Sequence, residues 1–400
     1  MDKVREHIDS IPRIESHYMR ANTSRQFIDG SKTVAELHRD YVNICKEEKV
    51  EYVNYAYYYN IFKNEYNISF FSPKKDQCDT CEAFDNATDA EKQSLKENYD
   101  QHHLEKQLSR NEKNLDKTTT PSTHAVAVYD LQAVFPLPKG DVSLFYYKSK
   151  LNVLNFTIYD LKSNECYCYV WDESNGHRGV NELGSYVLDF MKKCSDKGIT
   201  DITFYSDNCG GQQKNKFMLS LYLYAVNFLN IKSVTHKYLI RGHTQNEGDS
   251  AHSLIERNMK RLQKSGPIFL PETFITGIRT AKKRGEPFKV KEMTFEDFLN
   301  IKMIATDLGS LNMKGVKMNQ IKALKLSSES PCSVFCKHSY QEDFHEVIVL
   351  KKKKTNSDGV TLIPCYNSKP GISQAKKEDL MELCRKNLIP KQYKPFYENL

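Results

Sequence analysis

The sequence lacks a long hydrophobic run. Its most apolar stretch, residues 217–231, is interrupted by Ser220, Asn227 and Asn230. It is also shorter than the roughly 20 residues that a membrane-spanning helix needs. The first residues, MDKVREHIDSIP, are charged and lack the apolar stretch of a secretory signal peptide. We therefore expect a soluble intracellular protein with no membrane association, and a buried helix over residues 217–231.

Two further features are missing. The 11 cysteines are an odd number and are scattered along the chain, whereas small disulfide-bonded domains contain a dense and even-numbered set. The string GGQQKNK, residues 210–216, has neither the spacing nor the Ser/Thr of a nucleotide-binding P-loop. These absences favour a reducing compartment with free thiols and argue against a nucleoside triphosphatase.

Basic residues exceed acidic ones only mildly, by a formal net charge of +7 over 400 residues. Such an excess permits nucleic-acid binding without demanding it. The basic clusters at residues 282–284 and 351–354 have the composition of nuclear import signals, and solvated loops would explain them equally well. Since 39% of the residues are hydrophobic, the chain can build real cores. We expect a nuclear protein of roughly two to four folding units.

Residues 1–72 are expected to form a helical region. Apolar residues at helical spacing follow Thr33, which is a suitable N-cap, and a second, tyrosine-rich helix is expected over residues 54–66. Two short helices with a tight connection suit a helix-turn-helix module that binds DNA. An ordinary helical hairpin fits the pattern as well, so both interpretations stay open.

Residues 73–121 contain a cysteine pair and a polar helix expected over residues 89–115, and they end in a threonine-rich linker expected at residues 116–123. Cys78 and Cys81 are spaced as CxxC, which supplies half of a zinc site. His103 is the predicted third ligand, with His102 beside it as the alternative. The candidates for the fourth ligand, which the sequence does not identify, are Cys45 and His124.

The zinc interpretation competes with a plainer one. A single CxxC pair is modest evidence, and a helix with two histidines is usually just polar surface. Three residues near the C-terminus make a weaker second candidate, for which buried free thiols are the favoured interpretation. They are Cys332, Cys336 and His338.

After the linker the sequence changes from polar helical segments to apolar segments rich in β-branched and aromatic residues. Residues 122–265 read as strand, strand, strand, helix, strand, helix, strand, helix, which predicts an α/β domain with a mixed five-stranded sheet flanked by helices. Residues 266–400 turn basic and are expected to form a small α+β region. The expected strands are 124–135, 144–161, 166–173, 202–206 and 233–240, with later pieces at 333–340 and 344–350; the expected helices are 180–194, 213–229, 245–262 and 376–390.

Three aspartates occupy positions at which a catalytic or metal-binding carboxylate is expected. Asp130 lies within an apolar strand, where a charge is costly unless something compensates for it. Asp207 follows another strand, and ligand sites in α/β sheets favour such strand ends. Gly210 and Gly211 after it allow a sharp turn and the close approach of a substrate.

The third acid lies in the string RGHTQNEGDSAHSLIER. Thr244 and Glu247 fit a capping box, so Glu247 is expected to start the helix. Asp249 is therefore the predicted third acid. His252 and Glu256 share its helical face and are expected to orient water or metal.

Clustered carboxylates are what phosphodiester chemistry needs. Two Mg²⁺ or Mn²⁺ ions neutralise the scissile phosphate and help an oxygen nucleophile, and they require hard oxygen ligands. Asp130, Asp207 and Asp249 are the predicted metal ligands and, with His252 and Glu256, the predicted catalytic residues. Separate structural roles for each aspartate are the competing interpretation.

Several strings together resemble a family. They look like a group of transposon-derived proteins common in insects and other animals, with a domain similar to ribonuclease H and to the DDE transposases and integrases. The strings are VYDLQ, YSDNCGGQQKNK, RGHTQNEGDSAHSLIER and VWDESNGHRGVNELGSY, with SPKKDQCDTC upstream and PCYNSKPGISQAKKEDL downstream.

The resemblance implies a ribonuclease-H-like five-stranded sheet, with its second strand antiparallel and Mg²⁺- or Mn²⁺-binding carboxylates at its centre. Asp130 would be the first-strand acid, Asp207 the fourth-strand acid and Asp249 the last acid, where many of these enzymes have glutamate. The implied activity is a DDE-type transposase or nuclease acting on DNA. A domesticated, catalytically inactive nucleic-acid binder and a partner-binding scaffold are the alternatives, and a homo-oligomer stays open.

Overall fold

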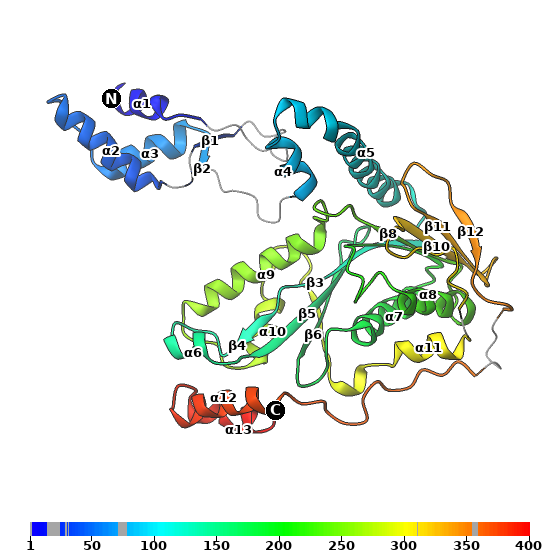
Figure 1. Ribbon diagram of the computed structural model, residues 1–400. Helices are drawn as coiled ribbons and strands as arrows, with labels where there is room; N and C mark the ends of the chain where they lie inside the picture. The colour runs from blue at the N-terminus through cyan, green and yellow to red at the C-terminus, as the bar shows by residue number, and fades with distance from the viewer. Residues whose placement is uncertain are drawn as a thin grey trace. The chain divides into compact units, whose positions relative to one another are not determined.

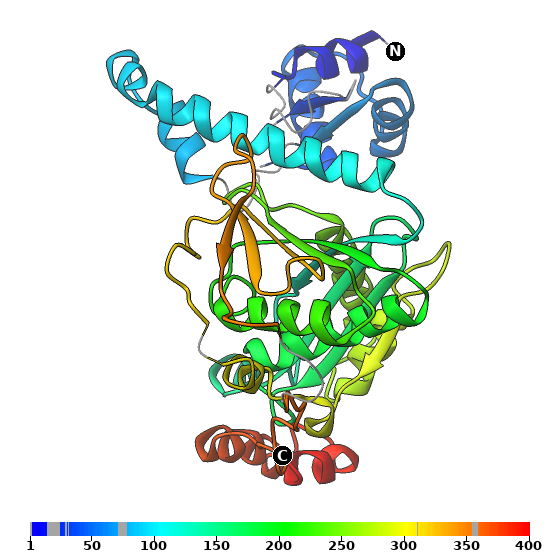
Figure 2. The ribbon, with the colours of Figure 1, turned by 90° about the vertical axis from the view of Figure 1, so that its right-hand side faces the viewer.

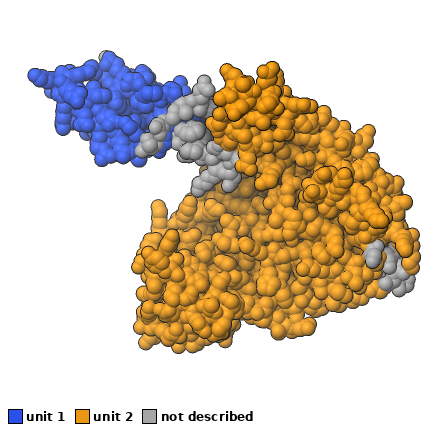
Figure 3. Space-filling view, viewed as in Figure 1, with its two compact units in different colours: residues 1–77 blue, residues 78–400 orange. Residues whose placement is uncertain are grey.

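The computed structural model describes residues 2–13, 25–28, 30, 32–70, 78–309, 311–353 and 359–400. The chain divides into two compact units, residues 1–77 and residues 78–400 (Figure 3). In the part of the chain that the structure describes, no helix is both long enough and apolar enough to cross a membrane.

The first unit is helical, as predicted, with a small sheet added. Its elements are α1 (Asp2–Ser10), β1 (Gln26–Ile28), α2 (Val34–Glu47), α3 (Tyr55–Glu65) and β2 (Ile68–Phe70). The strands pair in parallel. The predicted N-cap is confirmed, because the Thr33 side chain accepts a hydrogen bond from the backbone of Glu36 and the Glu36 carboxylate accepts one from the backbone of Thr33. The connection at residues 48–54 is longer than the three- to four-residue turn of a helix-turn-helix, and DNA binding by this unit stays a prediction.

The second unit contains a mixed sheet of ten strands and the remaining described helices. Its strands are β3 (His124–Leu131), β4 (Phe135–Leu137), β5 (Leu151–Asp160), β6 (Cys166–Asp172), β7 (Asp201–Ser206), β8 (Ser233–Tyr238), β9 (Lys289–Glu292), β10 (Ala323–Ser327), β11 (Ser333–Lys337) and β12 (His345–Ile348). Its helices are α4 (Asp79–Asp85), α5 (Asp89–Thr119), α6 (Ser143–Tyr147), α7 (Val180–Asp196), α8 (Lys216–Phe228), α9 (Glu247–Gln263), α10 (Pro271–Arg279), α11 (Ile301–Asp307), α12 (Gln374–Arg385) and α13 (Lys394–Glu398).

The five strands expected from the sequence form the centre of this sheet, in the order β6-β5-β3-β7-β8. The second of these strands along the chain, β5, is antiparallel to β3. β7 and β8 both run parallel to β3. The predicted α/β class and mixed sheet are therefore confirmed. Figure 1 shows these strands between two groups of helices.

The sheet extends beyond the predicted five strands at both edges. β9 pairs in parallel with β6, and β10, β11 and β12 continue antiparallel from β8. Strands of residues 266–400 thus complete the same sheet instead of building a separate small region. β11 and β12 correspond to the strand pieces expected at residues 333–340 and 344–350. β9 and β10 were not predicted, because short strands alternate weakly, as the KVKE of β9 illustrates.

Helices cover both faces of the sheet (Figures 1 and 2). On one face α7, α8 and α11 enclose the larger hydrophobic core, into which Tyr129 of β3 points. On the other face α9, α10, α12 and α13 pack on β4, β5 and β6. Because side chains alternate along a strand, Asp130 faces the side opposite to Tyr129. The buried helix expected over residues 217–231 is confirmed as α8.

Two local predictions were wrong. Residues 143–147 form the short helix α6 and not the beginning of a strand. The first part of the expected linker belongs to α5, which continues as far as Thr119, and the hydroxyls of Thr118 and Thr119 bond back to carbonyls one turn earlier. Asp116 further fixes this end, since its carboxylate accepts hydrogen bonds from Tyr205 at 2.5 Å and from Lys237 at 2.7 Å.

Candidate functional site

Asp130 is positioned by β3 and by the start of α9. In the antiparallel register, Asp130 lies opposite Thr157 of β5. Its Oδ1 accepts a hydrogen bond from the backbone of Leu131 at 2.8 Å. A Cβ added at Gly248, in the first turn of α9, would lie 3.7 Å from the Cβ of Asp130, which is an ordinary van der Waals contact. The first turn of α9 therefore packs beside this carboxylate.

Asp249 lies in the same first turn. Its Oδ2 accepts a hydrogen bond from the backbone of Asn246 at 2.9 Å, while the Asn246 side chain accepts one from Gly248 at 2.7 Å. This Asn246–Asp249 capping box replaces the predicted box of Thr244 and Glu247. Asn246 displaces Thr244 because it is the residue directly before the helix, and Glu247 pairs instead with Lys113 at 2.5 Å. Capping holds the Asp249 carboxylate at the helix start.

His252 completes a compact group. One ligand atom from each of Asp130, Asp249 and His252 lies within 4.8 Å of the others. The His252 ring is buried, and its Nε2 lies 3.0 Å from Oγ1 of Thr157. Burial lowers the pKa of His252 to about 4, so the ring is neutral near pH 7 and can offer a lone pair to a cation. Glu256, predicted to join this group, is exposed and is not part of it.

Asp207 follows β7 and acts on the group through its charge. Its Oδ1 accepts a hydrogen bond from the backbone of Cys209 at 3.0 Å. Burial and then the charges of Asp207 and Asp249 raise the pKa of Asp130 to about 7. Burial and the charge of Asp249 also raise the pKa of Asp207, although the Cys209 hydrogen bond opposes this. Asp207 is not within the 4.8 Å group itself.

This arrangement is electrostatically strained without a counter-ion. Two carboxylates within 4.8 Å of one another repel by about 3 kcal/mol at an effective dielectric constant of about 20. A proton on Asp130 relieves the repulsion, and a bound cation would relieve it as well. Asp130 and Asp249 thus lie together, as predicted. Asp207 lies outside this group, and its charge raises the pKa of Asp130.

A cavity of about 800 Å³ adjoins Asp207. Three cationic side chains line it, Lys214, Arg241 and Lys322. Burial and then the charge of Lys322 lower the pKa of Lys214 to about 8, and its Nζ donates to Oδ1 of Asn208 at 3.0 Å. Positive charge next to a carboxylate that faces a cavity is suited to an anionic ligand that also contacts a cation.

A second group combines sulfur and nitrogen ligands. Cys78 and Cys81, predicted as half of a metal site, lie together with His102 and His243, with all four ligand atoms within 4.8 Å of one another. His103, the predicted third ligand, is not in this group, although its Nε2 lies 3.6 Å from Cys81 Sγ. Its ring packs on Tyr99.

His243 was missed by the sequence analysis. It is separated from Cys81 by 162 positions, so no local spacing could have indicated it. The candidate fourth ligands lie elsewhere: Cys45 is buried in the core of the first unit, and Nε2 of His124 is 2.9 Å from the Thr203 hydroxyl. These two groups are the ones in the described residues that could hold a metal ion.

Comparison with known proteins gives one match. Residues 160–338 match a family described as "Domain of unknown function (DUF7869)". The matched part includes Asp207, Asp249, His252 and His243 and begins after Asp130. No curated protein and no solved structure is significantly similar to the chain.

The weaker cysteine candidate is not assembled. In the described part of the chain, Cys332, Cys336 and His338 do not form a group that could bind a metal. Cys336 is buried in the larger core, and the ring of His338 stacks on His345 with centroids 4.9 Å apart. Of the buried free thiols that were expected, both cysteines are unpaired, but Cys336 is buried and Cys332 is half-buried.

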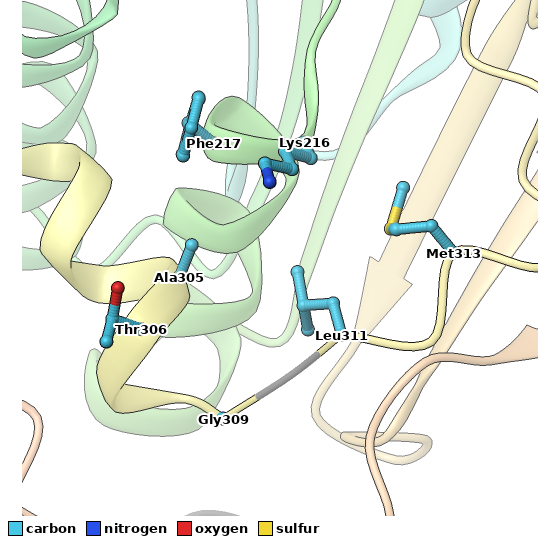
Figure 4. A pocket seen from close by; sticks show the side chains of 7 residues that line it. All are labelled: Lys216, Phe217, Ala305, Thr306, Gly309, Leu311 and Met313. Carbon is cyan, nitrogen blue, oxygen red and sulfur yellow. The ribbon is translucent and has the colours of Figure 1, made fainter.

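A smaller cavity of about 350 Å³ lies between the start of α8 and the end of α11 (Figure 4). Its lining contains one cation, Lys216, and no carboxylate, imidazole or thiol. Figure 4 shows Leu311 beside it and Ala305 and Thr306 on α11. This set of side chains offers no chemistry beyond packing, so we assign no site to it.

Proposed function

We propose that the chain is a divalent-metal-dependent phosphoryl-transfer enzyme of the DDE transposase or nuclease type, acting on DNA in the nucleus. The observation that carries the proposal is the group formed by Asp130, Asp249 and His252, within 4.8 Å of one another. The neighbouring charge of Asp207 helps to raise the pKa of Asp130 to about 7. Perturbed carboxylates of this kind are typical of functional sites.

The fold supports a ribonuclease-H-like domain. The central strands include an antiparallel second strand, and the first carboxylate stands on the first strand, as the resemblance implies. The second carboxylate follows the fourth strand and the third begins a helix packed on the first strand. The elements thus occur in the expected order along the chain.

The ligand atoms fit Mg²⁺ or Mn²⁺. Carboxylate oxygens are hard ligands that these ions prefer, and a neutral imidazole is acceptable to Mn²⁺. Asp130, Asp207 and Asp249 would hold two ions, with His252 next to them. Such ions, when bound, neutralise charge on a phosphodiester and lower the pKa of an attacking hydroxyl. The second group, with thiolate and imidazole ligands, suits Zn²⁺ instead.

Lys214, Arg241 and Lys322 would contact the backbone of the DNA. Phosphate oxygens would enter the cavity that these side chains share with Asp207. Arginine and lysine supply most of the phosphate contacts in protein–DNA complexes. Their place beside the carboxylates would bring a phosphodiester up to the metal ligands.

Cleavage of duplex DNA tests the function directly. The wild-type protein is expected to cut or join DNA in Mg²⁺ or Mn²⁺ and not in a chelator, and Asp207→Asn is expected to remove this activity. The substitution keeps an acceptor for the Cys209 amide, so the turn should persist. Salt-dependent binding without cleavage in any divalent ion would favour the inactive binder, and full cleavage by Asp130→Ala would overturn the site assignment.

The cationic cavity makes a separate prediction. Arg241→Ala and Lys322→Ala are each expected to weaken DNA binding and to reduce the slope of log K against log [salt] by about 1, since each removes one phosphate contact. Lys283→Ala is the matched control, because Lys283 is an exposed lysine that does not line the cavity. Equal salt slopes for all three variants would contradict this use of the cavity.

A further inference from the structure

Four sulfur and nitrogen ligands converge from three separate segments of the second unit. Cys78 directly precedes α4, Cys81 lies in its first turn, His102 lies in α5, and His243 lies in the loop between β8 and α9. We infer that these four residues form a structural zinc site, which fastens the loop between β8 and α9 to α4 and α5.

The distances between ligand atoms suit a tetrahedral ion. Cys78 Sγ lies 3.2 Å from His102 Nε2, Cys81 Sγ lies 3.4 Å from His243 Nε2, and the two Nε2 atoms are 3.1 Å apart. Tetrahedral Zn²⁺, with bonds of about 2.3 Å to sulfur and about 2.0–2.1 Å to nitrogen, separates S and N by about 3.5 Å and two N by about 3.3 Å. The observed edges are a few tenths of an ångström shorter, so a small expansion admits the ion.

The number and burial of the ligands indicate a structural ion. Two thiols and two imidazoles fill all four tetrahedral positions, whereas a catalytic zinc keeps one position open for water or substrate. Cys78, Cys81 and His243 are each more than nine-tenths buried. The soft sulfur ligands favour Zn²⁺ over Mg²⁺.

The backbone of the loop is fitted to the cysteine pair. Gly242 has φ +76°, a conformation that L side chains rarely adopt. A Cβ on Gly242 would lie 2.6 Å from the Cβ and 2.8 Å from the Sγ of Cys78. Glycine is therefore required for the loop to approach Cys78 closely enough to present His243.

Zinc at this place would also order the proposed active site. Arg241 and Thr244, on either side of the Gly242–His243 pair, line the cavity with Asp207. The same loop ends at Asn246, whose side chain and backbone cap the helix and hold Asp249. Zinc binding itself is independent of the proposed function; the positioning role of the ion rests on that function.

Metal analysis of the full-length protein, purified without chelator, tests the site. We expect about one zinc per chain in the wild type and at least a fivefold lower content in His102→Ala and His243→Ala. His103→Ala is the matched control, since His103 neighbours His102 but is outside the four ligands. Cys332→Ser is the thiol control. Both controls are expected to keep their zinc. Zinc loss in His103→Ala equal to that in His102→Ala, or full zinc in His243→Ala, would overturn the assignment.

A second measurement covers variants that fail to fold. Replacing the zinc of the wild-type protein by Co²⁺ is expected to give the strong visible d–d bands of a tetrahedral site together with a thiolate charge-transfer band. Wild-type protein that binds neither Zn²⁺ nor Co²⁺ would show that the four residues are only a hydrogen-bonded thiol–imidazole cluster, and the inference would be wrong.

The positioning role has its own readout. Zinc removal is expected to lower Mg²⁺-dependent DNA cleavage at least tenfold, with recovery when Zn²⁺ is restored in stoichiometric amount. Protein with one zinc and no cleavage in any divalent ion would leave the zinc site standing and overturn the proposed function. Unchanged cleavage by zinc-free protein would overturn the positioning role alone.

Discussion

Asp249→Asn is expected to reduce Mg²⁺-dependent DNA cleavage by about 10²–10³-fold, a loss of roughly 3–4 kcal/mol of transition-state stabilisation. The substitution removes a negative ligand from the group that Asp249 forms with Asp130 and His252. It preserves the helix start, because the amide oxygen of asparagine can still accept the hydrogen bond from the Asn246 backbone. The measurement is the initial rate of strand cleavage at saturating Mg²⁺.

The matched control lies on the same helix. Glu256→Gln removes the same charge from an exposed position and is expected to leave the cleavage rate within about threefold of wild type, as is usual for surface substitutions. Far-UV circular dichroism should be unchanged in both variants. Equal losses in the two variants would mean that the general negative charge of α9 matters, and that the geometry of Asp249 does not.

Asp130→Asn is expected to stabilise the protein in the absence of added Mg²⁺ or Mn²⁺ at pH 8. Burial, with the charges of Asp207 and Asp249, raises the pKa of Asp130 from 3.8 to about 7. The folded state therefore keeps a proton that the unfolded state releases, so this group lowers stability as the pH rises from about 4 to about 7. Removing the charge should raise the free energy of unfolding on the order of 2–4 kcal/mol at pH 8, and by almost nothing below pH 4.

Urea unfolding at pH 8 and pH 4 measures this difference. Mg²⁺ should stabilise the wild-type protein at pH 8 by mass action and have a much smaller effect on the variant. A variant that is less stable than wild type at pH 8, together with a wild type that does not respond to Mg²⁺, would show that the carboxylates are individually structural and do not bind a cation together.

The two groups of side chains differ in how far the sequence could predict them. Asp130 was predicted because a charge within an apolar strand breaks the local pattern, and Asp249 was predicted because Glu247 was assigned to the helix cap. His252 followed from its helical spacing to Asp249. Glu256 has the same periodicity, but it is exposed, although the adjacent Ile255 is buried in the core on that side of the sheet. Helical periodicity predicts that residues share a face of the helix. It does not predict which of those residues lies close to Asp130.

Side-chain composition alone misled the prediction at two places. The aromatic run at residues 144–147 has the composition of a strand, but it forms α6, in which Phe145 is buried while Tyr146 and Tyr147 are exposed. The threonines at the end of α5 indicated a linker, but Asp116 is held by Tyr205 and Lys237 of the sheet. In both cases contacts with distant residues outweighed a weak local preference.

The sequence by itself determined the central strands, the main helices and the Thr33 cap, because these depend on residues within a few positions of one another. Only the tertiary structure decided which of these elements meet: the strands after residue 289 that complete the sheet, the carboxylates gathered beneath α9, and His243 beside a cysteine pair 162 positions away. Bringing residues of such separation together costs loop-closure entropy, which is offset only by the packing of the whole core. A local sequence pattern contains no information about that packing.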